Sequence, residues 1–139
     1  MRKDVNMYGL AVRQPYASLI AVGKKTIEVR SKPWKYRGPV IICASKNPRI
    51  KLESGEYLPT GAAVAIVDMV DCRPLVKADL KPACLQADYT FQELDGSYAW
   101  ILSNPREIEP IPGKWIVAPW PWKGAEPVLA PGWHERIGF

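Results

Sequence analysis

The chain contains one histidine and three cysteines, and this scarcity excludes several kinds of chemistry. Cys43, Cys72 and Cys84 are widely spaced and form no CxxC pair, so a zinc site with four closely spaced ligands is not expected. The single histidine, His134, lies in the tail sequence WHERIGF, where we expect a surface position that excludes most Ser-His-Asp and Cys-His arrangements. The sequence therefore predicts no metal, no cofactor, and free thiols typical of a reducing cytoplasm.

Long apolar runs are also absent. No stretch approaches the roughly 18 residues that span a bilayer, and the N-terminal sequence MRKDVNMYGL lacks the apolar region of a signal peptide. The length of 139 residues, with 47% hydrophobic and 24% charged residues, suits one ordinary globular domain. We therefore expect a single domain over residues 1–139, located in the cytoplasm, with no membrane partner; the oligomeric state stays open.

Positive charge is concentrated in one segment. Nine of the 19 Lys and Arg residues lie within residues 24–51, where Glu28 is the only acid. From residue 52 onward the chain has seven basic and twelve acidic residues. Such a one-sided field concentrates anions, and a phosphate backbone is the commonest large anion that a cytosolic protein meets. A nucleic acid is therefore the expected partner, and a solvated basic face without a partner is the alternative.

An early helix is marked at both of its ends. Pro15 suits a first helical turn, because the N–H groups of that turn have no hydrogen-bond partner within the helix and proline has no N–H. Gly23 suits the position just after a last turn, so we expect a helix at about residues 15–22. Polar and apolar residues then alternate over residues 24–31, which predicts a half-buried strand.

The remainder of the chain is typical of short strands separated by proline-rich turns. Pro105 is expected to end one strand, because proline has no N–H for a sheet ladder. Five to six strands with an early helix and short additional helices predict a mainly β (α+β) barrel. The expected strands are residues 7–13, 39–45, 61–72, 98–104 and 114–119, with a short helix near residues 77–80 and a Trp/Pro-rich tail, residues 118–139, packed on or beside the barrel.

Three blocks of the sequence, in order, resemble the signature of the ASCH domain (activating-signal-cointegrator homology), a member of the PUA-like superfamily. VRQPYASLIAVGKKTIEVRSKPWKYRGPVIICASK contains a GxKxxExR element at Gly23, Lys25, Glu28 and Arg30. GAAVAIVDMVDCRPL resembles the central strand of the family, and YAWILSNPREIEPIPGKWIV resembles its closing strands. The resemblance covers roughly residues 8–117.

This resemblance implies a small PUA-like β-barrel with a cleft beside the early helix. PUA-like domains generally bind RNA or modified nucleosides, so it implies a protein that binds nucleic acid, RNA above all, or a modified nucleoside. Some small bacterial ASCH proteins hydrolyse an acetylated cytidine nucleoside, and another is described as a ribonuclease. A metal-independent amidohydrolase of N4-acylated cytidine, or a ribonuclease, is thus the alternative. A third reading is a protein-interaction module that uses its Trp-rich tail.

The resemblance also implies catalytic candidates. The lysine that matches Lys25 is catalytic in the hydrolase branch, and a lysine acts as nucleophile or base only when its pKa is depressed; otherwise it binds phosphate. Glu28 either transfers protons or forms an ion pair with Arg30 or Lys25, and the hydrolase branch has threonine at this position. Its catalytic acid comes from the central strand, where Asp68 is the best match. We expect Asp68, or Asp71, to face Lys25, unless both lie at an exposed strand end.

A wider set of residues is expected to line the cleft. Gln14 can read a base edge, and Tyr16 can stack on a base unless it belongs to the core. Lys35 and Arg37 belong to a basic loop with interleaved aromatic residues, a pattern that suits single-stranded RNA. The residues expected to bind nucleic acid or a nucleoside are Gln14, Tyr16, Lys24, Lys25, Thr26, Arg30, Lys35, Arg37, Ser45 and Lys46.

Overall fold

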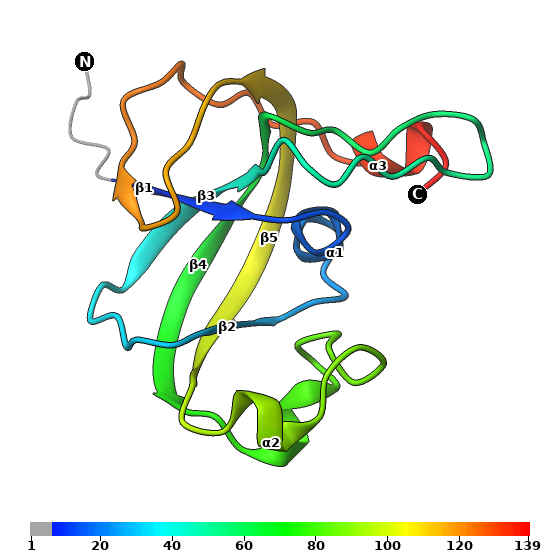
Figure 1. Cartoon of the computed structure of the whole chain (residues 1–139). Coiled ribbons are helices and arrows are strands. Elements are labelled where there is room, and N and C mark those ends of the chain that lie inside the picture. Colours follow the sequence, from blue (N-terminus) through cyan, green and yellow to red (C-terminus); the bar gives the residue numbers. More distant parts are fainter. Residues whose placement is uncertain (1–6) are drawn as a thin grey trace.

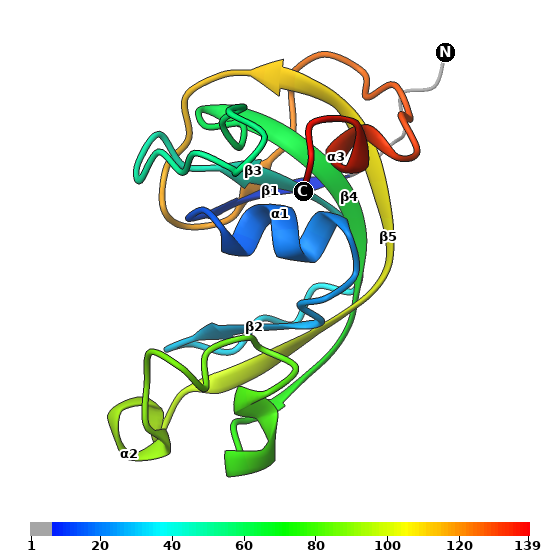
Figure 2. The same cartoon turned by 90° about the vertical axis from the view of Figure 1, so that its right-hand side faces the viewer.

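The structure is a computed structural model that describes residues 7–139. Six strands form one sheet in the order β2-β5-β4-β3-β1-β6. Strands β1 and β3 run parallel, and the other neighbouring strands run antiparallel. The sheet curls into a half-barrel (Figures 1 and 2), which confirms the predicted mainly β fold. The strands are β1 (Tyr8–Val12), β2 (Ile27–Arg30), β3 (Gly38–Ala44), β4 (Ala62–Pro74), β5 (Tyr98–Pro112) and β6 (Trp120–Pro121).

Helix α1 (Tyr16–Ala21) lies in the hollow of the curled sheet, between β1 and β2 in Figure 2. Pro15 precedes its first turn, and Gly23 follows its last turn with a φ of +84°, a conformation that glycine adopts without strain. The predicted helix at about residues 15–22 is therefore confirmed. Three shorter helical segments complete the fold: the 3₁₀ helix η1 (Lys77–Leu80), α2 (Phe91–Leu94) and α3 (Trp133–Arg136).

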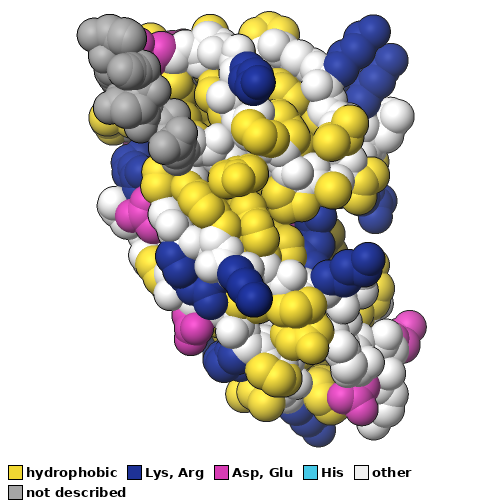
Figure 3. All heavy atoms as spheres, turned by 90° about the vertical axis from the view of Figure 1, so that its left-hand side faces the viewer, with side chains coloured by type: hydrophobic (Ala, Val, Ile, Leu, Met, Phe, Trp, Pro, Cys, Tyr) yellow, Lys and Arg dark blue, Asp and Glu magenta, His cyan; other side chains and the backbone are white. Residues whose placement is uncertain are grey.

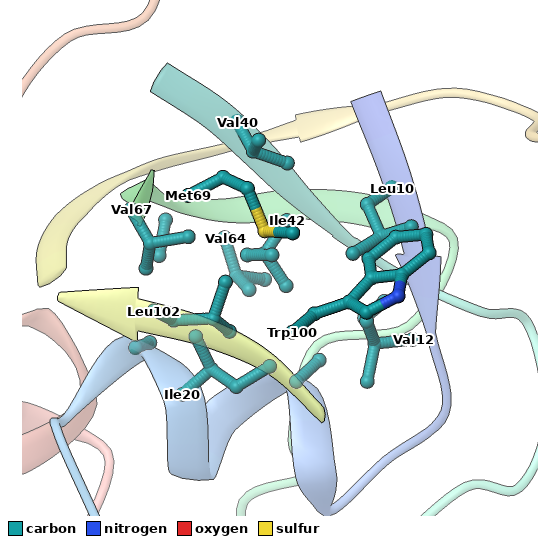
Figure 4. Close-up of a cluster of buried hydrophobic side chains, with 14 residues drawn as sticks. Leu10, Val12, Ile20, Val40, Ile42, Val64, Val67, Met69, Trp100 and Leu102 are labelled. Atoms are coloured by element: carbon teal, nitrogen blue, oxygen red, sulfur yellow. The ribbon is translucent and has the colours of Figure 1, made fainter. Parts of the chain in front are cut away.

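The main core fills the space between α1 and the sheet. Figure 4 shows its side chains, which come from α1 and four strands of the sheet and point toward one another. Each fully buried aliphatic side chain stabilises the fold by about 1.5–3 kcal/mol relative to an exposed one. The labelled members are Leu10, Val12, Ile20, Val40, Ile42, Val64, Val67, Met69, Trp100 and Leu102.

The second face of β3 is covered as well. Ile41 and Cys43 are both 0% exposed, and they pack with Ile108 and with the partly buried rings of Trp115 and Trp120. Both faces of β3 are therefore buried, which agrees with its nearly continuous apolar sequence. All three cysteines are free thiols.

The predicted end of the strand at Pro105 is wrong, because β5 continues to Pro112. The ladder between β4 and β5 shifts register between Ile66 and Asp68, opposite the segment that contains Pro105. Asn104, directly before this proline, has a φ of +53°. A bulge leaves one residue outside the ladder, so a proline there removes no ladder hydrogen bond.

The strand predicted at residues 114–119 is also wrong, and a two-residue strand, β6, follows it instead. Trp115 folds back over Gly113, where an added Cβ would lie 2.4 Å from the indole ring. The same ring stacks on Trp120 with 5.5 Å between ring centroids. Burial of Trp115 among other aromatic rings thus turns this segment away from an extended ladder.

His134 is completely buried, so the expected surface position is wrong. Its Nδ1–H donates to Glu107 at 2.8 Å, and its Nε2 accepts from the hydroxyl of Ser18 at 2.9 Å. The Ser18 oxygen in turn accepts from Gln14 Nε2 at 2.8 Å. Each of these three hydrogen bonds then joins one donor to one acceptor. The neutral imidazole connects α3 to α1 and β5.

Candidate functional site

Lys25 is a buried cation in the cleft beside α1. It is 2% exposed, and its Nζ donates to the carbonyl of Ala83 at 2.6 Å and lies 3.6 Å from a carboxylate oxygen of Glu28. The Tyr16 ring lies 5.2 Å from the same nitrogen. Burial lowers the pKa of the Lys25 ammonium from its ordinary value, although the Glu28 charge opposes part of this effect.

Glu28 and Arg30 come from alternate positions of β2 and lie on the same face of the strand. Arg30 Nε donates to Glu28 at 2.9 Å, and its two terminal nitrogens donate to the carbonyls of Ala11 at 2.6 Å and Val117 at 3.3 Å. Arg30 therefore connects the acid of the cleft to β1 and to the segment that precedes β6.

A pocket of about 250 Å³ opens beside Lys25 and Glu28. Asp88 accepts a hydrogen bond from the Tyr16 hydroxyl at 3.0 Å, so the loop after η1 is held against α1. Burial and this hydrogen bond raise the pKa of Tyr16 to about 12. Most walls are apolar, and polar groups are few, as in sites for small organic ligands. The lining residues are Val12, Arg13, Tyr16, Lys25, Glu28, Val29, Leu85, Tyr89 and Leu94.

A larger hollow of about 680 Å³ is lined in part by Ala11 and Val117, whose carbonyls accept hydrogen bonds from Arg30. It carries three cations, and none of its lining residues within the described chain is acidic. Hydroxyl and amide groups of Ser45, Asn47 and Thr60, all from the connection between β3 and β4, complete its surface. Its lining residues are Ala11, Ser45, Lys46, Asn47, Arg49, Thr60, Gly61, Gly113, Lys114, Trp115, Ile116 and Val117.

Comparisons with known proteins agree with this architecture. The family model of the ASCH domain matches residues 10–112. The chain belongs to the ASCH domain family. Three solved structures share the fold, namely an ASCH protein from Zymomonas mobilis (18% identity, TM-score 0.55, covering 76% of this chain and 73% of that one) and two of its point variants. The variants, a Tyr-to-Phe and a Ser-to-Ala protein, give 18% identity and TM-scores of 0.54, covering 76% and 80% of this chain and 75% and 77% of theirs. None of the curated proteins compared with the chain matches it.

Within this ASCH domain, the GxKxxExR element is brought together as the resemblance implied. Lys25, Glu28 and Arg30 form one connected set of ion pairs. Tyr16 lies over Lys25 and lines the smaller pocket, while Ser45 and Lys46 line the larger hollow.

Asp68 and Asp71 lie elsewhere. Val67 and Met69 point into the core, so Asp68 between them faces the opposite side of β4, where it pairs with Arg106 at 3.1 Å. The Asp71 side chain is 60% exposed. Among the residues that the structure describes, the acid beside Lys25 is Glu28.

Gln14 is fully engaged inside the protein. It is 1% exposed, its Nε2 donates to Ser18 and to the carbonyl of Pro59 at 2.8 Å, and its Oε1 accepts from the Ser18 N–H at 3.0 Å. These bonds leave its amide without a free edge for a base, so it positions α1 instead.

The remaining predicted binding residues lie outside both hollows. Lys24 and Thr26 are exposed on either side of Lys25. Lys35 is exposed, and Arg37 donates to the carbonyl of Trp34 at 2.8 Å and lies 3.8 Å from Asp71.

Sequence reasoning missed Arg49, Lys114 and Trp115 in the larger hollow and Tyr89 in the smaller pocket. Arg49 lies within the basic segment, which was a usable signal, whereas Lys114 and Tyr89 belong to segments without any pattern of charge. No group of three or more His, Cys, Asp or Glu side chains able to hold a metal ion occurs within residues 7–139. No helix in that range is long and apolar enough to cross a membrane.

Proposed function

We propose that this ASCH protein binds single-stranded RNA, with one unpaired base in the pocket beside Lys25 and the adjoining backbone along the larger hollow. The ASCH family is associated with RNA binding or related functions. The observation that carries the proposal is the pairing of a basic hollow with a base-sized pocket, linked by Arg30, which bonds to Glu28 of the pocket and to the carbonyls of Ala11 and Val117 of the hollow.

The larger hollow suits a phosphate backbone. Lys46, Arg49 and Lys114 supply its positive charge, and the carboxylates of the described residues lie outside its lining. Figure 3 shows Lys and Arg side chains across the middle of one face and around a hollow at its edge, with few Asp and Glu side chains among them. Cations in such an arrangement replace the counterions of a nucleic acid and give salt-dependent binding.

The smaller pocket suits a base. Its volume of about 250 Å³ lies below the roughly 300–1,000 Å³ typical of sites for larger organic ligands. The rings of Tyr16 and Tyr89 offer stacking surfaces. The Glu28 carboxylate can accept hydrogen bonds from the amino or imino group of an unpaired base, and Lys25 can donate to a ring carbonyl or, in adenine, to a ring nitrogen.

The test is the salt dependence of binding. The double variant Lys46→Ala/Lys114→Ala is expected to bind a fluorescein-labelled hexa-adenylate more weakly and with a log–log salt slope smaller by about 1.4, since each contact to a single strand releases about 0.7 of a counterion. Its matched control, Lys123→Ala/Arg136→Ala, removes two exposed cations outside the described hollows and should retain the wild-type slope. Equal slopes in the two variants would contradict the proposal.

A second candidate is a metal-independent amidohydrolase that acts on an N4-acylated cytidine nucleoside. One observation favours it: Lys25, whose pKa is lowered by burial, lies at a pocket large enough for a base and next to a carboxylate. A lysine of this kind can act as nucleophile or base.

A further inference from the structure

A third hollow, of about 700 Å³, lies between η1 and α2 at the end of the half-barrel where Figure 2 shows α2. Among the described residues that line it there are two lysines and no acid. Aromatic rings and side-chain amides make up most of the remaining surface. Its lining includes Lys77, Lys81, Gln86, Tyr89, Phe91 and Gln92.

Two acids next to this hollow have hydrogen-bond partners of their own. Asp79 forms two hydrogen bonds of 2.8 Å with the guanidinium of Arg73. The Glu93 carboxylate accepts from the N–H of Thr90 at 2.8 Å at the start of α2. Within the lining itself the charged groups are Lys77 and Lys81, which favour an anion, whereas the carboxylates of Asp79, Asp88 and Glu93 lie outside it.

Tyr89 connects this hollow to the pocket beside Lys25, because its side chain lines both. It is 38% exposed, so part of its side chain is accessible to a ligand. The backbone around it is fixed, since Tyr89 N donates to the carbonyl of Leu85 at 2.9 Å and the neighbouring Asp88 holds the Tyr16 hydroxyl. An aromatic ring fixed between two adjacent hollows is suited to stack on bases of consecutive nucleotides.

We infer that the hollow between η1 and α2 is a second nucleotide subsite, in which a base stacks on Tyr89 while Lys77 and Lys81 hold the phosphate that joins it to the base in the Lys25 pocket. This inference rests on the proposed function and makes it more specific. The ligand is then an oligonucleotide whose strand continues past the Lys25 pocket on the side opposite to the larger hollow.

The experiment compares adenosine, which has no phosphate, with the labelled hexa-adenylate. The variant Lys77→Ala/Lys81→Ala is expected to lower the salt slope for the hexamer by about 1.4 and to leave the affinity for adenosine unchanged, because the nucleoside occupies only the Lys25 pocket and brings no phosphate to the two lysines. Tyr89→Ala is expected to weaken hexamer binding about ten-fold, and Tyr89→Phe, which keeps the stacking ring, to bind like the wild type within about two-fold. Thermal unfolding of each variant checks that it is folded.

The outcomes separate the subsite from the proposed function. If Lys77→Ala/Lys81→Ala binds the hexamer like the Lys123→Ala/Arg136→Ala control while Lys46→Ala/Lys114→Ala loses slope, the subsite is overturned and RNA binding stands. If the wild type binds neither the hexamer nor adenosine, both are overturned. Loss of hexamer affinity in the Lys77→Ala/Lys81→Ala variant, with adenosine binding unaffected, supports the subsite.

Discussion

The ammonium nitrogen of Lys25 lies 3.6 Å from one carboxylate oxygen of Glu28, while the other oxygen accepts a hydrogen bond from Arg30 at 2.9 Å. Glu28 thus has two cationic partners, whereas the described chain gives Lys25 only this one acid. Because Lys25 is 2% exposed, its charge depends on Glu28 far more than the charge of Glu28 depends on Lys25.

Glu28→Gln is therefore expected to destabilise the protein more than Lys25→Met. The first change leaves a buried ammonium without a counter-charge, at a cost of about 3–5 kcal/mol. The second leaves Glu28 paired with Arg30 and deprives mainly the Ala83 carbonyl of its donor, at a cost of about 1–3 kcal/mol. Urea unfolding at pH 7 measures both, and the reverse ranking would show that the ion pair is not arranged as described.

The buried His134 makes stability depend on pH in a defined direction. Burial lowers the pKa of the imidazole in the folded protein, although Glu107 opposes part of this effect. The unfolded chain, with a histidine pKa of about 6.5, then binds more protons than the folded one. The free energy of unfolding is expected to fall as the pH drops below about 6.5, by at most about 1.4 kcal/mol per pH unit.

Because the sequence has a single histidine, a decrease in the free energy of unfolding just below pH 6.5 can be attributed to His134. His134→Gln should remove the decrease between about pH 6.5 and 5. A further decrease below about pH 4.5 should remain from acids such as Glu107, whose pKa is lowered by hydrogen bonds from His134 and Gly132 although burial acts to raise it. If the free energy of unfolding of His134→Gln decreased between pH 6.5 and 5 as in the wild type, the decrease could not be assigned to His134.

The features that could be predicted from the sequence are those set by neighbours along the chain. The helix between Pro15 and Gly23 follows from local conformational preferences, and the burial of both faces of β3 follows from its apolar run. The set of Lys25, Glu28 and Arg30 follows from the family signature, because these residues lie within one loop and one strand.

Features that depend on distant partners could not be predicted in this way. Alternation shows that Asp68 lies opposite to Val67 and Met69, but only the docking of α1 decides which face of β4 is the inner one. The burial of His134 requires Ser18, which is 116 residues away. The larger hollow likewise joins β1 to two connecting segments, residues 45–61 and 113–117, that are far apart in the sequence.

Gly9→Ala is expected to disturb the strand β6. Gly9 pairs with Trp120, and an added Cβ would lie 2.4 Å from the indole ring of Trp120. The ring must move, which breaks its stacking on Trp115 and destabilises the protein by about 1–3 kcal/mol. Urea unfolding and near-UV circular dichroism measure these changes. In a Trp120→Leu background the added methyl group should cost much less, and an equal cost in both backgrounds would exclude this mechanism.

Two sets of variants should separate RNA binding from nucleoside hydrolysis. If the protein binds a strand, Lys46→Ala/Lys114→Ala should reduce affinity and salt slope most, and Lys25→Ala should cost no more than about one contact. Lys35→Ala/Arg37→Ala removes two cations that lie outside both hollows. Its loss of affinity and of salt slope should lie between the losses of Lys46→Ala/Lys114→Ala and of the Lys123→Ala/Arg136→Ala control.

If the protein is a hydrolase, the ranking inverts. Lys25→Ala should then abolish release of the acyl group from N4-acetylcytidine, because no other described amine lines the smaller pocket beside Glu28. The cations of the larger hollow should not matter for this reaction, because a nucleoside carries no phosphate. We expect the binding ranking, since Lys46, Arg49 and Lys114 lie together in a hollow that an uncharged nucleoside would not need. Turnover that depends on Lys25, with RNA binding that is weak and insensitive to salt, would show that hydrolysis is the function instead.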